Sequence, residues 1–177
     1  MFLYFITENL RKVQEAQAIV PEIHQLSYEL IEIQSLDSQA IIKAKLQEAR
    51  KVTTKPYIVD DTSLYLSCIP GLPGPLIKWF LKALGAHGVY ELAARLNNLE
   101  AEAKTIIGLS YNNQEYFFEG SIKGTLVPPR GQHAFGWNPI FKPQGLTTTF
   151  AEMTIPEIAA ISMRGQALRK LKEFLQI

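Results

Sequence analysis

The stretch from Tyr57 to Leu64 constrains the fold more than any other part of the chain. It is a short apolar run with a β-branched pair, and it carries two adjacent carboxylates, Asp60 and Asp61. Such a run is typical of a buried strand, and α/β sheets present ligand-binding groups where their strands end. The sequence therefore predicts a central strand that ends at Asp60 and Asp61 and offers them as a metal site or a general base.

A loop punctuated by glycine and proline follows this strand almost at once. Gly71, Pro73, Gly74 and Pro75 favour a rigid turn. The next helix is predicted to begin just after the turn, where Lys78 would face a bound anion. At this spacing, the acid pair and the loop together are a specific signal for a ligand site.

The N-terminal segment is a second candidate for anion binding. Phe2 to Thr7 is predicted to form a strand that passes directly into an amphipathic helix ending near Val20. Such a turn leaves free backbone N–H groups at the positive end of a helix dipole, which favours phosphate. Thr7 and Asn9 would hydrogen-bond the anion and Lys12 would add charge. The alternative is that Asn9 only caps the helix and that Lys12 is solvated.

The remaining segments show strand and helix patterns in turn. They predict a strand over 24–34, helices over 38–52, 76–84 and 89–96, antiparallel strands over 105–111 and 116–126 joined through Asn112 and Asn113, and a helix over 162–176. Residues 1–177 show no linker and no internal repeat. We therefore expect one α/β domain with a mixed sheet and two lobes flanking a cleft.

Basic residues of the 38–52 helix receive two different predictions. Lys43, Lys45 and Arg50 are expected on a solvated face. Lys51 lies at the end of the helix, close in sequence to the strand that carries the acid pair, so we expect it at the ligand site.

Two segments near the C-terminal end carry further candidates. The aromatic stretch 135–141 is typical of a loop that stacks on a nucleobase, but equally of a packed surface loop. In the last helix, Ser162 is the expected N-cap and Arg164 lies in the first turn. Because a cation there opposes the helix dipole, Arg164 needs an anionic or carbonyl partner.

Charge and cysteine content exclude several classes of protein. The net charge of +1 argues against a strongly basic nucleic-acid binder. Cys68 is the single cysteine of the sequence, which excludes an intrachain disulfide and multi-cysteine zinc sites, and His24, His87 and His133 lack metal-ligand spacing. No signal peptide and no apolar run of about 20 residues is present. We expect a cytoplasmic protein that binds neither nucleic acid nor a membrane.

Motifs in a fixed order cover nearly the whole chain. They are Thr7-x-Asn9-x-x-Lys12, Asp60-Asp61-Thr62-Ser63-Leu64, Gly71-Leu72-Pro73-Gly74-Pro75-x-Ile77-Lys78-Trp79-Phe80-Leu81, Phe118-x-Gly120-x-x-x-Gly124, Pro129-Arg130-Gly131, Phe135-Gly136-Trp137-x-Pro139-Ile140-Phe141, Thr149-Phe150-Ala151-Glu152-Met153 and Ile161-Ser162-x-Arg164. This order resembles the Ham1-type purine nucleoside triphosphate pyrophosphatases, which remove inosine and xanthosine triphosphates.

The resemblance implies an elongated fold with a long twisted mixed sheet flanked by helices, and usually a homodimer. It implies that water attacks the α-phosphorus of a purine nucleoside triphosphate, with Mg²⁺ or Mn²⁺ as cofactor, giving the monophosphate and pyrophosphate. Asp61 matches the residue that activates water, and Asp60 matches its neighbour in the metal site. The matching substrate-binding positions are Thr7, Asn9, Lys12, Lys51, Lys78, Phe135, Gly136, Trp137, Asn138, Ser162 and Arg164. Among these, Arg164 would donate to the 6-oxo group of the base.

Several positions depart from the family pattern. Glu8 replaces a glycine, Asn138 replaces an aspartate, and Ile158, Ala159 and Met163 replace polar residues. In an ungapped match, Ala40 replaces a metal-site glutamate. In another register, Asp37 or Gln39 would take the place of that glutamate. The phosphate half of the site is therefore better preserved than the base half. The first hypothesis is a pyrophosphatase with altered or weakened activity. The alternative is a catalytically degenerate nucleotide-binding or interaction protein on the same fold.

Overall fold

The computed structural model describes residues 2–132 and 135–177, so His133 lies outside the described residues. Within them, one sheet has the strand order β2-β1-β3-β5-β6-β7, with β4 paired to β3. The strands are β1 (Leu3–Ile6), β2 (Ile23–Leu26), β3 (Tyr57–Leu66), β4 (Pro73–Gly74), β5 (Glu100–Tyr111), β6 (Gln114–Leu126) and β7 (Phe141–Pro143). β1 pairs with β2 and β3 in parallel, and the other pairs are antiparallel. The predicted mixed sheet is confirmed.

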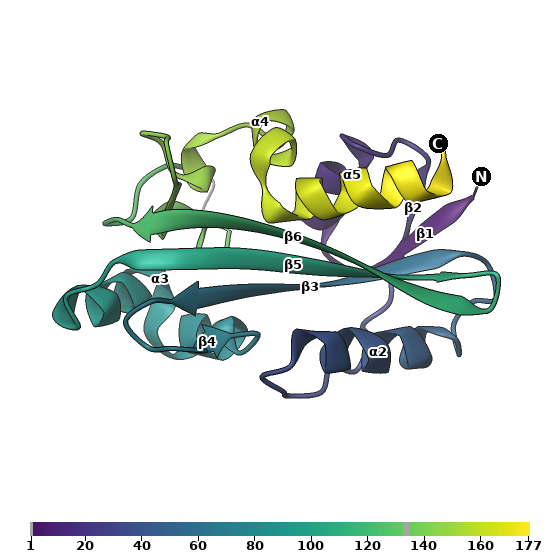
Figure 1. The fold of residues 1–177 in the computed structure, drawn as a ribbon, viewed down its shortest axis with the longest axis horizontal. Coiled ribbons are helices and arrows are strands. Elements are labelled where there is room, and N and C mark those ends of the chain that lie inside the picture. Colours follow the sequence, from purple (N-terminus) through teal and green to yellow (C-terminus); the bar gives the residue numbers. More distant parts are fainter. Residues whose placement is uncertain (1, 133–134) are drawn as a thin grey trace.

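Three long strands, β3, β5 and β6, run along most of the molecule and twist around one another (Figure 1). The predicted hairpin joins β5 to β6 at Asn112 and Asn113, whose φ angles are 50° and 60°. Asparagine tolerates this left-handed conformation, which two-residue hairpin turns require. The turn keeps the strands in register along their whole length, so both are longer than predicted.

Helices cover both faces of the sheet (Figure 1). They are α1 (Leu10–Gln17), α2 (Ser38–Ala49), α3 (Ile77–Arg95), α4 (Ile155–Ile161) and α5 (Met163–Leu175), with short 3₁₀ turns η1 (Asn138–Ile140) and η2 (Phe150–Glu152). α1, α4 and α5 lie on one face, and α2 and α3 lie on the other. The predicted division of α3 occurs at Gly85, where φ is 70° and ψ is 172°, whereas Gly88 lies within the second half of the helix.

Buried apolar side chains form separate clusters at the two ends of the long strands. One cluster surrounds α3 and η1 and includes Ile77, Val89 and Trp137. Two others lie at the opposite end, one beneath α1 and α5 and one beneath α2. The cores of the two expected lobes are therefore distinct, and the long strands connect them.

Two predicted strands have different ends in the structure. β3 does not end at Asp60 and Asp61, because its pairing with β5 continues from Tyr57↔Ser110 to Leu66↔Ala101. The acid pair therefore lies in the middle of the strand. β2 ends at Leu26 instead of residue 34, because its partner β1 ends at Ile6 and no further ladder is available.

Among the described residues, no helix combines the length and the hydropathy that crossing a membrane would need.

Candidate active site

A cavity of about 730 Å³ lies between the two lobes. Its walls come from α1, β3, α3, the segment 135–138 and the α4–α5 junction. Its charged lining residues Lys12, Lys45 and Asp61 are grouped around the acid pair, which makes a charged end, whereas Trp137 and Met163 belong to the apolar cluster around α3 and η1, which makes an apolar end. A ligand with an anionic half and an aromatic half would fit these two ends.

Asp60 is the centre of a buried charge cluster beside the cavity. Its carboxylate accepts hydrogen bonds from Lys12 Nζ at 2.8 Å and from Arg164 Nε at 3.1 Å. The side chain is only 3% exposed. Burial alone would raise the pKa of Asp60, but the charges of Lys12, Arg164 and Lys45 outweigh it and hold that pKa well below its usual 3.8. Asp60 is therefore a carboxylate, and Lys12 is paired instead of solvated.

Arg164 makes polar contacts through all three nitrogens of its guanidinium group. Besides Asp60, it donates through Nη1 to Glu15 and through Nη2 to Thr62 Oγ1 at 3.1 Å. The anionic partner that its position in the helix required is thus part of the chain itself. Glu15 was not among the predicted site residues, although its place three residues after Lys12 puts both side chains on one face of α1.

Asp61 points to the opposite side of β3, since successive side chains of a strand alternate between the two faces. Ser63 Oγ donates to its Oδ2 at 3.3 Å, and Lys45 Nζ lies 3.9 Å from its Oδ1. Burial is the main reason that the pKa of Asp61 is raised to about 6, with the charge of Lys45 opposing the rise and that of Glu32 adding to it. Asp61 is thus a weakly acidic carboxyl group at the wall of the cavity.

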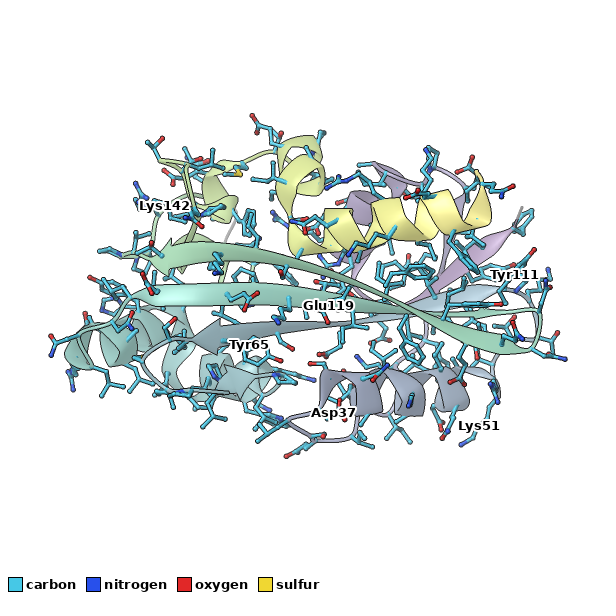
Figure 2. All side chains as sticks on the ribbon, in the orientation of Figure 1. Asp37, Lys51, Tyr65, Tyr111, Glu119 and Lys142 are labelled. Carbon is cyan, nitrogen blue, oxygen red and sulfur yellow. The ribbon has the colours of Figure 1, made fainter. Side chains whose placement is uncertain are left out.

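Lys45 was predicted on a solvated face, and that prediction is wrong. Its side chain is 9% exposed, pairs with Glu32 and donates to the backbone carbonyl of Asp60 at 2.9 Å. Lys51, which was predicted at the site, is 70% exposed and pairs with Glu48 at 2.6 Å. Figure 2 shows Lys51 at the end of α2 that lies opposite Asp37. Lys51 lies beyond the end of α2 at Ala49, so it does not share the buried face of the helix on which Lys45 lies.

Asn9 caps α1, as the alternative prediction stated. Its Oδ1 accepts from the backbone N–H groups of Arg11 at 3.0 Å and Lys12 at 3.3 Å, and its own N–H donates to Thr7 Oγ1 at 3.1 Å. Asn9 also lines the cavity, whereas Thr7 and the exposed Glu8 line an adjoining hollow of about 200 Å³.

The apolar end of the cavity is built by the aromatic segment and the α4–α5 junction. Trp137 is buried, with its ring centroid 5.2 Å from that of Phe141, while Phe135 is 38% exposed. The segment therefore contains both a packed core residue and a cavity-lining ring. The predicted residues Gly136, Asn138 and Lys78 also line the cavity, as do Ile158 and Met163, which depart from the family pattern. Ser162 is buried as the N-cap of α5, where it accepts from the Gly165 N–H at 3.1 Å.

The residues around Asp61 fit a magnesium ion of the kind that the family implies. In 2–132 and 135–177, no group of three or more histidine, cysteine or acidic side chains is placed to hold a metal alone. Asp61 and Glu32, however, both contact Lys45 Nζ. Mg²⁺ is usually held by one or two carboxylates together with substrate phosphates, so this pair suffices. Glu32 thus supplies a carboxylate that Ala40 lacks. Of the two substitutes predicted for Ala40, Asp37 caps α2 and Gln39 lines a different hollow.

Comparison with known proteins gives full-length matches. The model of the Ham1 family matches residues 3–174. The inosine triphosphate pyrophosphatase of Yarrowia lipolytica is 39% identical over 99% of this chain and 96% of its own length. Among solved structures, a HAM1 protein from Coxiella burnetii has a TM-score of 0.80 at 25% identity, covering 99% of both chains. A nucleoside-triphosphatase, dITP/XTP pyrophosphatase, from Mycobacterium abscessus has a TM-score of 0.70 at 27% identity, covering 97% of this chain and 98% of its own.

Proposed function

Because this chain belongs to the Ham1 family, we propose that it hydrolyses inosine, deoxyinosine and xanthosine triphosphates to the monophosphate and pyrophosphate. The family resemblance that the motif order predicted is confirmed. The observation that carries the proposal is the two-ended cavity with Asp61 at its wall, between lysines and an apolar pocket. It is an enzyme of the hydrolase class, like the relatives named for this activity.

The triphosphate is proposed to lie at the charged end of the cavity. Lys12, Lys45 and Lys78 line the cavity and would offset much of the phosphate charge. Asp61 and Glu32 would hold Mg²⁺ or Mn²⁺, which supplies further neutralisation of the phosphates when bound. The base would lie at the apolar end, against the rings of Phe135 and Trp137.

Asp61 is proposed as the group that takes the proton of the attacking water. In the metal-free protein the pKa of Asp61 is about 6, so Asp61 is a carboxylate at pH 7, the form that accepts a proton or binds a cation. Asp60 keeps Lys12 and Arg164 in place from the other side of the strand. Arg164 uses three of its five N–H donors on Asp60, Glu15 and Thr62, so the second N–H of Nη1 or of Nη2 would be its donor to a 6-oxo group.

The test is pyrophosphate release from a panel of inosine, xanthosine, guanosine, adenosine and pyrimidine triphosphates, with magnesium or manganese. Selective turnover of the 6-oxopurines, abolished by Asp61→Ala in a folded variant, is the expected result. Binding of inosine triphosphate without turnover would favour the alternative, a catalytically degenerate nucleotide-binding protein. Glu32 argues against that alternative, because it supplies a carboxylate where Ala40 cannot.

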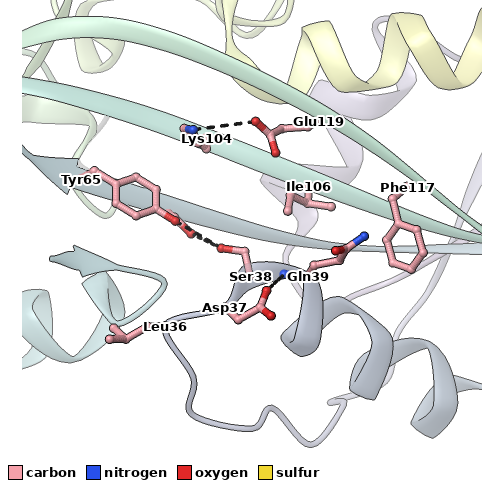
Figure 3. Close-up of a pocket in the computed structure, with 10 residues that line it drawn as sticks. Leu36, Asp37, Ser38, Gln39, Tyr65, Lys104, Ile106, Phe117 and Glu119 are labelled. Atoms are coloured by element: carbon pink, nitrogen blue, oxygen red, sulfur yellow. Dashed lines mark hydrogen bonds and ion pairs between the residues drawn. The ribbon is translucent and has the colours of Figure 1, made fainter. Parts of the chain in front are cut away.

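We also propose that the protein is a homodimer. A hollow of about 480 Å³ lies on the sheet face beyond the N-terminal end of α2 (Figure 3). It carries both charges, with Lys104 Nζ 3.9 Å from Glu119 Oε1, beside the apolar Phe117. A two-fold axis could place Lys104 of one copy opposite Glu119 of another. Light scattering should give twice the chain mass, and Lys104→Glu should lower it. The single domain and the cytoplasmic location expected from the sequence stay predictions.

A further inference from the structure

Arg11 contacts the apolar end of the cavity from α1. Its guanidinium carbon lies 5.7 Å from the centroid of the Phe135 ring, within the range of a cation–π interaction. Its Nε lies 3.6 Å from Glu15 Oε1, and its side chain is 19% exposed. That Nε is buried and has no hydrogen-bond acceptor among the described residues. Arg11 is therefore held by the carboxylate of Glu15 and by the face of the ring.

Arg11 meets the cavity through the Phe135 ring. In the part of the chain that the structure describes, Phe135 lines the cavity and Arg11 does not. The Phe135 carbonyl accepts from the Asn138 N–H at 3.0 Å. This bond holds the backbone but leaves the ring free to rotate about its side-chain torsions. The contact with Arg11 restricts that rotation.

Glu15 connects this contact to the buried charge cluster. One of its oxygens faces Arg11 and the other accepts from Arg164, which also pairs with Asp60. Because Glu15 is buried, it has little freedom to release either arginine. The position of Arg11 is thus fixed through Glu15, which lines the cavity together with Arg164.

From these contacts we infer that Arg11 is a positioning residue that holds the Phe135 ring against the purine. This inference rests on the proposed function, because it presumes that a base occupies the apolar end of the cavity. A cation on one face of an aromatic ring fixes its orientation, and a base stacks on the other face. Arg11 acts on base binding and leaves the phosphate contacts and the attacking water unchanged.

Arg11→Gln tests the inference, because glutamine keeps a long polar side chain but removes the cation. We expect the KM for inosine triphosphate to rise by about three- to tenfold, as for loss of one cation–π contact, with kcat within about twofold. Arg11→Lys retains a cation and should restore most of the affinity. In a Phe135→Leu background, Arg11→Gln should add no further change, since the ring face is already absent.

Two controls separate this role from others. Arg50→Gln removes an arginine that pairs with Glu115 at 2.7 Å on the far end of α2, and it should leave KM unchanged. Inorganic tripolyphosphate serves as a base-free competitive inhibitor, and Arg11→Gln should not alter its inhibition constant. A parallel rise of that constant and of KM would mean that Arg11 acts on the phosphates, and the inference would be wrong.

The proposed function and this inference fail in different ways. If the wild-type protein releases no pyrophosphate from inosine triphosphate, the proposed function is wrong, and the role of Arg11 is then decided by calorimetric binding of the same nucleotide. If the wild type is active and Arg11→Gln leaves KM unchanged, the inference is refuted while the function stands.

Discussion

Replacing Asp60 by asparagine should destabilise the protein, because it removes the shared partner of two buried cations. Breaking a buried ion pair costs about 3–5 kcal/mol. Asp60 contacts Lys12 at 2.8 Å and Arg164 at 3.1 Å, but Arg164 retains Glu15. We therefore expect a loss near the lower limit, about 3 kcal/mol in the free energy of unfolding at pH 7.

The loss should depend on pH in one direction. The pKa of Asp60 in the folded protein lies below its usual 3.8, so its stabilising contribution is complete above that value and declines as the pH falls towards the folded pKa. The difference between wild type and Asp60→Asn should be constant from pH 5 to 8 and smaller by about 1 kcal/mol at pH 3.

Urea unfolding followed by circular dichroism at pH 7 and pH 3 measures this difference. Asp37→Asn is the matched control, because Asp37 is an exposed cap of α2 and asparagine caps equally well. A destabilisation by Asp60→Asn below about 1 kcal/mol at pH 7, or one that grows on acidification, would refute the buried pairing.

Three further outcomes test the site and the packing around it. Lys45→Ala should lower kcat/KM for inosine triphosphate by at least about tenfold, as for loss of a buried charged hydrogen bond. Lys51→Ala should leave kcat/KM within about twofold, because that side chain is 70% exposed. Steady-state kinetics measures both effects. Chelation should stop turnover, and added magnesium should restore it. The apparent magnesium affinity should weaken as the pH falls through about 6, the pKa of Asp61, because protons then compete for the carboxylate. Gly120→Ala should lower the melting temperature by about 3–10 °C, because the added Cβ would lie 2.0 Å from the Met163 carbonyl oxygen; an unchanged melting temperature would show that α5 packs differently.

Local sequence signals predicted most of the fold. The hairpin at Asn112 and Asn113 was predicted because a two-residue turn needs a conformation that asparagine tolerates. The cap at Ser162 and the division at Gly85 follow from equally local chemistry. The ends of β2 and β3 were misplaced, because the end of a strand depends on the length of its partner, which a single segment does not specify.

The candidate site was predicted less completely because its charges are paired across the chain. A lysine on a helix looks solvated until the packing direction of that helix is known, and so Lys45 was passed over for Lys51. Glu15 and Glu32 lie outside the motifs, and their roles become visible only beside Arg164 and Lys45. The need for a partner at Arg164 was predictable from the helix dipole, but the identity of that partner was not.

The pairing of Asp60 with Arg164 also affects how the chain folds during its synthesis on the ribosome. The two residues are 104 positions apart, and chains emerge at roughly 5–20 residues per second. For several seconds after β3 has emerged, Asp60 lacks one of its two cations, and β5 and β6 emerge during that interval, before Arg164. The central strand thus cannot settle into its final surroundings until α5 has emerged, and a nascent chain stalled before Arg164 would be a substrate for chaperones and proteases.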